Sequence, residues 1–234
     1  MQHQWMLAAL TMVLMGISAQ AQEVIEPFNG KDLTGWTTKE PKERSHWKVG
    51  LAAVDEQNPS KIVFSEKPEG EPGHLVNVQG GGVDIYTLEK YGDAVIEVEV
   101  LVPRGSNSGI YVMGEYEVQV FDSYGKETLG GGDMGALYGA APPRVNATKK
   151  PGEWNKFVID YRAPRFNEQG EKIANAKFVK ITLNGQTLHE NVEMKGPTPT
   201  GVSGKEAPKG PLMFQGDHGP VAYRNLRIIP RDQQ

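Results

Sequence analysis

The stretch Gly109–Phe121, which reads GIYVMGEYEVQVF, carries the pattern that decides the fold. Aromatic and β-branched residues are frequent in it, and such residues favour strands. Because the side chains of a strand alternate between its two faces, this stretch predicts one apolar face and one polar, aromatic face. The apolar face would hold Val112, Tyr116, Val118 and Val120, and the polar face Tyr111, Met113, Glu115, Glu117 and Gln119.

Further strand patterns flank this stretch on both sides. Residues 93–102 alternate between apolar side chains and glutamates, which is typical of a strand with one buried side. Asn184-Gly185 is a strong signal for a hairpin turn, with a strand on either side of it. The other predicted strands cover residues 154–161, 177–183, 211–215 and 223–229, with one more beginning near 186.

Loops rich in glycine or proline separate these strands, as at residues 128–135, 139–143 and 195–211, and no helix of three turns is predicted. Many short strands with little helix are typical of two antiparallel sheets packed face to face. The sequence therefore predicts an all-β protein, a β-sandwich of the jelly-roll type with one concave sheet.

The first 21 residues predict a secretory signal. An apolar run from Leu7 to Ile17 leads into Ala19-Gln20-Ala21, a small-x-small cleavage pattern. The run is shorter than the roughly 20 apolar residues that span a bilayer, and a retained anchor is the alternative. Residues 22–234 would then form a single domain, without a membrane span, that is periplasmic or extracellular.

Composition argues against several classes of function. The chain has no cysteine, so it forms neither a disulfide nor a cysteine-ligated metal site. The formal net charge is −4 and no long basic run is present, which argues against nucleic acid as a partner. No metal site is assigned, although Asp122, Asp133 and Asp217 offer oxygen ligands of the kind that a divalent cation such as calcium prefers.

Glu115 and Glu117 are the two carboxylates on the predicted polar face. Neighbours on one face of a strand lie about 6.7 Å apart, from a rise of ~3.3–3.4 Å per residue. This spacing falls within the roughly 6.5–9.5 Å between the carboxylates of inverting glycosidases. The alternative for both residues is a solvated strand face.

A second group of chemically useful residues lies in the turn QGDHGP at residues 215–220. Turns at strand ends often carry functional sites. The imidazole of His218 suits acid–base chemistry at neutral pH, and Asp217 is placed to orient it or to bind a cation. The alternative is that Asp217 caps the turn and His218 is an ordinary surface residue.

Aromatic and amide side chains complete the candidate site. Aromatic rings stack on the apolar face of a pyranose, while amides hydrogen-bond its hydroxyls. Core packing is the alternative for Trp154, and a surface ion pair is the alternative for Arg144. We predict that the substrate-binding residues are Asn107, Tyr111, Glu115, Gln119, Tyr138, Arg144, Trp154 and Gln215.

Six sequence blocks together resemble the 3-keto-disaccharide hydrolase domain family. They are FNGKDLTGW at 28–36, NSGIYV at 107–112, YEVQVFDS at 116–123, GALYGAAPP at 135–143, PGEWN at 151–155 and QGDHGPVAYRNLRI at 215–228. They follow the order of the family and cover nearly all of the chain after the signal. The resemblance implies a concanavalin-like, laminin-G-like jelly roll in exported bacterial proteins that act on glycosides oxidised at C3.

The resemblance also implies cleavage of the glycosidic bond, by net hydrolysis or by elimination followed by hydration. A C3 ketone acidifies the proton on C2, so a base that removes this proton lets the C1 substituent leave. We expect Glu117 as the base and His218 as the acid, with Asp217 beside it. A non-catalytic carbohydrate-binding module is the runner-up, because one fold hosts many functions. An ordinary glycoside hydrolase is a weaker third hypothesis, since no Glu-x-Asp-x-x-Glu strand motif is present.

Overall fold

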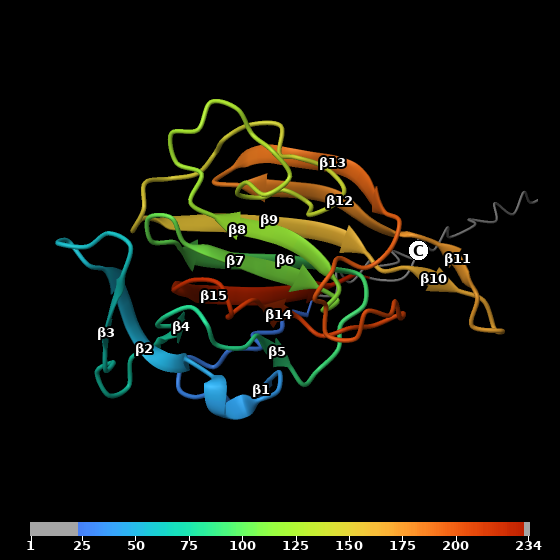
Figure 1. The fold of residues 1–234 in the computed structure, drawn as a ribbon. Coiled ribbons are helices and arrows are strands. Elements are labelled where there is room, and N and C mark those ends of the chain that lie inside the picture. Colours follow the sequence, from blue (N-terminus) through green and yellow to red (C-terminus); the bar gives the residue numbers. More distant parts are fainter. Residues whose placement is uncertain (1–22, 232–234) are drawn as a thin grey trace, which may run out of the picture.

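The computed structural model describes residues 23–231, so the predicted signal at 1–21 lies outside the described residues. The strands form two large antiparallel sheets and a separate two-stranded ribbon (Figure 1). The only helical element in this part of the chain is a single 3-10 turn, η1 at Lys42–Arg44. No helix within residues 23–231 has the length and apolar character needed to cross a membrane. The predicted all-β sandwich of the jelly-roll type is confirmed.

The smaller sheet has five strands in the order β1-β5-β14-β7-β8. It contains both the hairpin formed by residues 109–121 and the strand that precedes the Asp217–His218 turn. Its strands are β1 Trp36–Thr38, β5 Ile85–Thr87, β14 Met213–Phe214, β7 Asn107–Val112 and β8 Tyr116–Phe121.

The larger sheet has eight strands in the order β13-β12-β9-β6-β15-β4-β2-β3. Its strands are β2 Trp47–Val54, β3 Ile62–Ser65, β4 His74–Asn77, β6 Ala94–Leu101, β9 Trp154–Arg162, β12 Ala176–Leu183, β13 Gln186–Met194 and β15 Val221–Pro230. The ribbon consists of β10 Arg165–Phe166 and β11 Lys172–Ala174. The predictions for β6, β9, β12, β13 and β15 are confirmed, whereas the bounds of β2, β3 and β4 were not predicted.

The prediction of one continuous strand over Gly109–Phe121 is wrong, because this stretch folds into the β7–β8 hairpin. Met113 and Gly114 have positive φ angles of 60° and 71°, as in the type I′ turns that close hairpins. The backbone N–H of Glu115 donates to the carbonyl oxygen of Val112 at 3.1 Å. Tyr111 pairs directly with Glu117, so these two side chains share a face as predicted. Met113, predicted on the same polar face, instead lies in the core because the turn reverses the chain there.

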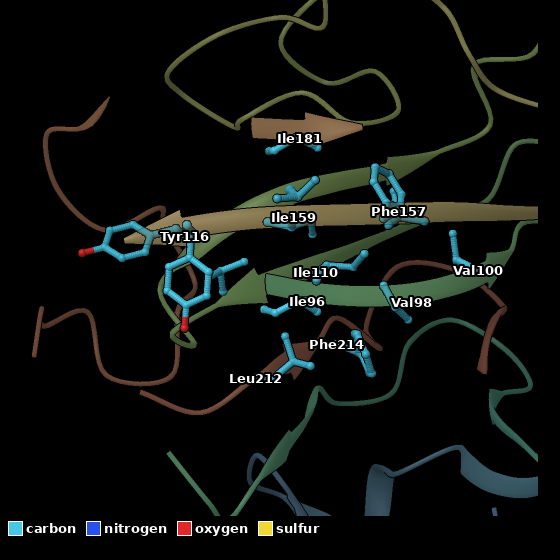
Figure 2. Close-up of a cluster of buried hydrophobic side chains, with 14 of the residues drawn as sticks. Ile96, Val98, Val100, Ile110, Tyr116, Phe157, Ile159, Ile181, Leu212 and Phe214 are labelled. Carbon is cyan, nitrogen blue, oxygen red and sulfur yellow. The ribbon is translucent and has the colours of Figure 1, made fainter. Parts of the chain in front are cut away.

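The apolar faces of the two sheets meet in one core. Figure 2 shows Ile110 of the smaller sheet close to Ile96 of the larger sheet, both fully buried. An aromatic stack joins the sheets, with the ring centroids of Phe214 and Tyr223 3.9 Å apart and nearly parallel. Trp36 extends this stack at 5.6 Å from Phe214. Because the core lies between the sheets, each sheet keeps one outer face for other functions.

Candidate functional site

The outer face of the smaller sheet carries the candidate site. Strand pairing aligns Glu117 of β8 with Tyr111 of β7, then with Met213 of β14 and Tyr86 of β5. These residues form one row across the sheet, because paired residues on neighbouring strands point to the same side. Val118 and Ile110 point the other way, into the core. The sheet therefore presents a tyrosine and a glutamate side by side on its outer face.

Glu117 is buried, with only 4% of its surface exposed, so the alternative interpretation of a solvated strand face is wrong for this residue. Burial raises the pKa of Glu117 to about 7, and the negative charges of Asp84 and Asp217 act in the same direction. A hydrogen bond with Tyr111 and the charge of His218 oppose this shift. A carboxylate with a pKa near neutrality is suited to accept a proton at physiological pH.

Gly109 leaves the space that the Glu117 carboxylate occupies. A Cβ atom at this glycine would lie 2.5 Å from Oε1 of Glu117 and 3.0 Å from a ring carbon of Tyr111. Both distances are shorter than normal contacts, and the φ angle of Gly109 is not in the left-handed region. The sequence therefore requires glycine here for space, and the carboxylate lies directly over the β7 backbone.

The Asp217–His218 turn lies within electrostatic reach of this carboxylate, since both charges act on the pKa of Glu117. Nδ1 of His218 is 2.5 Å from Oδ1 of Asp217. This contact has the orienting geometry expected from the sequence and leaves Nε2 of His218 without a hydrogen-bond partner in residues 23–231. Both side chains are about half exposed, so a ligand can reach them.

Asn77 holds this turn in place from the larger sheet. Its side chain is completely buried, and Nδ2 donates to the carbonyl oxygens of Gly216 at 3.0 Å and Gly219 at 2.9 Å. A Cβ atom at Gly80 would overlap the carbonyl oxygen of His218. Neither Asn77 nor Gly80 was predicted from the sequence, although the glycine run at 80–82 signals a close approach of backbones.

Asp84 and Lys39 are further site residues that the sequence did not reveal. Asp84 accepts a hydrogen bond from the backbone N–H of Gly216 at 2.9 Å and forms an ion pair with Lys39 at 2.9 Å. Lys39 also donates to the carbonyl oxygen of Thr200 at 2.6 Å, and the hydroxyl of Thr200 lies 3.0 Å from that of Tyr111. These contacts connect β1, β5, β7 and the 195–211 loop around the site.

Three amide side chains provide hydrogen-bonding groups on this face. Nε2 of Gln119 donates to Oδ1 of Asn107 at 2.8 Å, which leaves the other amide atom of each residue for a ligand. The backbone of Gln215 bonds to Gly109 at 3.0 Å, so it lies beside the Glu117 carboxylate. Oε1 of Gln215 is buried and has no hydrogen-bond partner among the described residues. An unpaired buried acceptor of this kind is costly unless a ligand or water satisfies it.

Tyr138 also lies at the predicted site. Its backbone N–H donates to the carbonyl oxygen of Glu117 at 3.1 Å, so the segment around it continues the smaller sheet beyond β8. The preceding residue, Leu137, is fully buried in the core. By alternation, the half-exposed ring of Tyr138 lies on the outer side, beside Glu117.

Glu115 lies in the turn of the hairpin and not on one continuous strand with Glu117. It precedes β8, is 4% exposed, and uses its carboxylate to hold the 195–211 loop. Oε1 accepts hydrogen bonds from the backbone N–H and hydroxyl of Ser203, at 2.8 and 2.7 Å. Oε2 accepts one from the backbone N–H of Gly204 at 3.0 Å. Both carboxylate oxygens of Glu115 are therefore bonded to this loop.

Arg144 and Trp154 lie away from this site. Arg144 is exposed and forms an ion pair with Glu190 of β13 at 2.8 Å, which is the alternative considered from the sequence. Trp154 lies on the outer face of the larger sheet, where its ring contacts the guanidinium of Arg224 at 4.1 Å. It is neither in the central core nor beside Glu117. In both cases the partner comes from a distant strand.

The three aspartates considered for a cation do not come together. Asp133 bonds to Lys126 and Ser123, while Asp122 accepts a hydrogen bond from the backbone of Gly105. Within residues 23–231 no group of three His, Asp or Glu side chains is arranged to hold a metal ion. The chemistry that this site offers directly is proton transfer by Glu117 and hydrogen bonding to hydroxyl groups.

A family model described as "3-keto-alpha-glucoside-1,2-lyase-like domain" matches residues 23–229. Two crystal structures of candidate glycosyl hydrolases from Parabacteroides distasonis ATCC 8503 are similar to the fold. The first is 27% identical with a TM-score of 0.64, over 89% of this chain and 84% of that one. The second is 22% identical with a TM-score of 0.59, over 89% and 94%. No curated protein matches the sequence.

Proposed function

This chain belongs to the 3-keto-disaccharide hydrolase family, whose domains are described as 3-keto-alpha-glucoside-1,2-lyase-like, and on this premise we propose that it cleaves the glycosidic bond of 3-keto-glycosides. Family membership and the solved relative at 27% identity indicate a carbohydrate-active protein. The reaction begins with removal of the C2 proton and proceeds by elimination, with or without later addition of water. The substrate is therefore a small oxidised glycoside.

The buried carboxylate of Glu117 is the observation that supports this proposal most directly. Its pKa of about 7 makes it a stronger base than an exposed glutamate and leaves much of it ionised at neutral pH. Burial and the pairing of β8 with β7, in which Glu117 stands opposite Tyr111, hold it on a rigid strand. Proton abstraction next to a carbonyl needs a base of this kind, held in a fixed position.

The proposed step is a β-elimination across C1 and C2 of the sugar. Glu117 takes the proton from C2, and the electron pair of the C2–H bond forms an enolate with its charge on the C3 oxygen. The C1–O bond then breaks as this pair forms the C1=C2 double bond. His218 gives a proton to the departing oxygen, so that a neutral alcohol leaves. Addition of water across C1=C2 completes a net hydrolysis.

Other residues of the site bind the sugar in this proposal. Gln119, Asn107 and Gln215 hydrogen-bond hydroxyl groups through the amide atoms that the protein leaves free. Tyr138 offers a half-exposed ring for stacking on the sugar. Lys39, which contacts Asp84 at 2.9 Å, supplies a positive charge for the enolate oxygen.

The test uses a 3-keto-glucoside with a chromogenic aglycone and the corresponding plain glucoside, each with EDTA and with added divalent cation. We expect release from the keto substrate alone, with an ultraviolet-absorbing C1=C2 product before hydration. Glu117→Gln and His218→Asn abolish or slow this release. Loss of release with EDTA would assign a role to a divalent cation.

Release from neither substrate, under any of these conditions, would contradict the proposal and favour a carbohydrate-binding module. Such a module needs no acid or base. Glu117→Gln and His218→Asn would then bind glycan as the wild type does, provided that they fold. Equal release from the plain glucoside would instead indicate an ordinary glycoside hydrolase.

A further inference from the structure

A groove with a volume of 610 Å³ lies on the outer face of the larger sheet, on the opposite side of the sandwich from Glu117. Glu99 of β6 pairs with Lys156 of β9 and with Arg224 of β15, so these side chains share one face. The neighbouring residue Tyr223 points into the core. The N-terminal segment 26–30 and residues 72–74 form the other wall of the groove.

The guanidinium of Arg224 is held rigidly in this groove. Its centre lies 4.1 Å from the ring centroid of Trp154, and Nε donates to Oε2 of Glu99 at 2.7 Å. These two contacts constrain both the plane and the direction of the group. No hydrogen bond within residues 23–231 uses its two terminal nitrogens. A planar pair of donors is therefore oriented before any ligand binds, which lowers the entropic cost of binding.

His74 provides a second oriented donor in the groove. Its Nδ1 accepts a hydrogen bond from the backbone N–H of Ala52 at 3.1 Å, and the edge of its ring contacts Trp154 at 4.8 Å. Burial, and then the charge of Arg224, lowers the pKa of His74. The ring is thus neutral with its hydrogen on Nε2, and Nε2 has no hydrogen-bond partner in the described part of the chain.

A bulge in β15 shapes the floor of the groove. The register of β15 with β6 shifts between Arg224 and Arg227, and Asn225 there has a positive φ of 51°. Bulges often redirect a side chain next to a functional site. The side chain of Asn225, together with Arg224, lowers the pKa of Glu99, so Asn225 also lies close to the carboxylate that holds Arg224.

The charges along the groove balance. Lys156 pairs with Glu97 at 3.1 Å, and Arg227 lies 4.0 Å from the same carboxylate. A groove with equal numbers of acids and bases attracts neither an anion nor a cation strongly. Its carboxylate oxygens accept hydrogen bonds while its cations and imidazole donate them. The charged residues that line it are Glu26, Glu97, Glu99, Lys156, Arg224 and Arg227.

We propose that this outer groove is a second carbohydrate-binding site, which takes a neutral glycan. Sugar hydroxyls both donate and accept hydrogen bonds, which matches the mixed donors and acceptors of the groove. Phe28 and Pro72 supply an apolar wall for the C–H face of a pyranose. The guanidinium of Arg224 binds two adjacent hydroxyl oxygens. The site is non-catalytic, and its ligand does not need a keto group.

The test is affinity electrophoresis in native gels that contain a β-glucan, dextran or soluble starch, with alginate as an anionic comparison. We expect at least one neutral glucan to retard the wild type. Arg224→Gln lowers that affinity at least tenfold, because the paired donors are lost. Arg224→Lys keeps the ion pair with Glu99 but loses the planar donor pair, so it also binds at least several-fold more weakly.

Arg231→Gln is the matched control, since Arg231 forms an exposed ion pair with Asp160 at 2.9 Å. It is expected to bind glucan as the wild type does. Thermal unfolding of all variants tests whether each one folds. If Arg224→Gln does not fold, Arg224→Lys still tests the proposal. Retardation by alginate alone, no retardation by any neutral glucan, or equal binding by folded Arg224 variants would overturn the proposal.

Discussion

The two outer faces of the sandwich carry glutamates on regular strands, yet they place them in opposite electrostatic environments. Glu117 on the smaller sheet is 4% exposed, and burial raises its pKa to about 7. Glu99 on the larger sheet is also partly buried, which by itself raises its pKa. Hydrogen bonds from Arg224 and Asn225 outweigh that effect and leave the pKa of Glu99 below its usual range.

The difference arises from the neighbours and not from the strands. Glu99 has Arg224 at 2.7 Å, whereas Glu117 has the hydroxyl of Tyr111 and the negative charges of Asp84 and Asp217 around it. A carboxylate paired with a guanidinium is a weak base, while a buried one among hydroxyls and acids is a stronger base. The same alternating pattern can therefore produce either a structural ion pair or a candidate catalytic base.

The largest expected effect is on the reaction of the smaller sheet. Glu117→Gln removes the proposed base, and general-base catalysis contributes about 10²–10⁴-fold. We expect kcat/KM for a chromogenic 3-keto-glucoside to fall by about this factor. Glu190→Gln, which removes an exposed carboxylate paired with Arg144, is the control and should stay within about twofold of the wild type. A Glu117→Gln variant with the wild-type rate would show that Glu117 is not the catalytic base.

The second effect is on the free energy of unfolding, which should change in opposite directions when Glu117 or Glu99 is replaced. The pKa of Glu117 is about 7 in the folded protein and 4.5 without its surroundings, so the folded state binds this proton more tightly. The stability it contributes is complete below pH 4.5 and is lost as the pH rises through 7. Glu117→Gln should therefore raise the free energy of unfolding at pH 8 by roughly 3 kcal/mol, at ~1.36 kcal/mol per pKa unit.

Glu99→Gln provides the matched comparison for this stability effect. It breaks a partly exposed ion pair and should lower the free energy of unfolding by about 0.5–1 kcal/mol at pH 8. Urea unfolding of both variants at pH 4.5 and pH 8 measures the difference. If both variants shift the free energy of unfolding in the same direction at pH 8, Glu117 and Glu99 do not contribute to stability with opposite signs.

A smaller effect is expected from crowding the carboxylate. Gly109→Ala puts a methyl group 2.5 Å from Oε1 of Glu117 and forces it to move. Misplacement of a catalytic group by about 1 Å costs up to ~10²-fold, so we expect kcat to fall by about ten- to a hundredfold with less change in KM. Gly131→Ala is the control, because a Cβ atom there meets nothing within 4 Å. Equal rates for the two variants would contradict the close contact.

The smallest effect is on the pH profile. If ionised Glu117 is the base, kcat/KM rises with pH through about 7. Asp84→Asn removes a negative charge that raises the pKa of Glu117, so this rise should shift to lower pH. The amide oxygen of the substituted side chain still accepts the hydrogen bond from the backbone N–H of Gly216. A shift to higher pH, or none, would mean that Asp84 does not act on the base.

Much of the fold was predictable because its signals are local. Alternation over residues 93–102 and the Asn184-Gly185 turn place β6, β12 and β13 nearly at their observed ends. The hairpin turn at Met113-Gly114 was missed, because Met113 is an unusual residue at positive φ and the apolar pattern runs through the turn without a break. β2 was missed because its mixed composition does not show a clear period of two.

Some residues of the candidate site were also predicted from local signals, while others were not. Glu117, Tyr111 and Gln119 were predicted on a shared face from alternation alone, and the structure places them there. Glu115 was assigned by the same alternation, which the hairpin turn interrupts, and Trp154 was assigned by residue type; both have other partners in the structure. Asp84 and Asn77 escaped notice because their role comes from contacts with the 216–219 turn, more than 130 positions away.

By itself, the sequence determined the all-β architecture, the family and the presence of a polar strand face next to an Asp–His turn. The architecture and the strand face follow from residue periodicity and turn chemistry, which act over a few positions, whereas the family follows from the resemblance of six sequence blocks. Only the tertiary structure decided which glutamate has a raised pKa and which has a lowered one. Burial and the charge of neighbours set the pKa of a carboxylate, and both depend on strands that are distant in sequence.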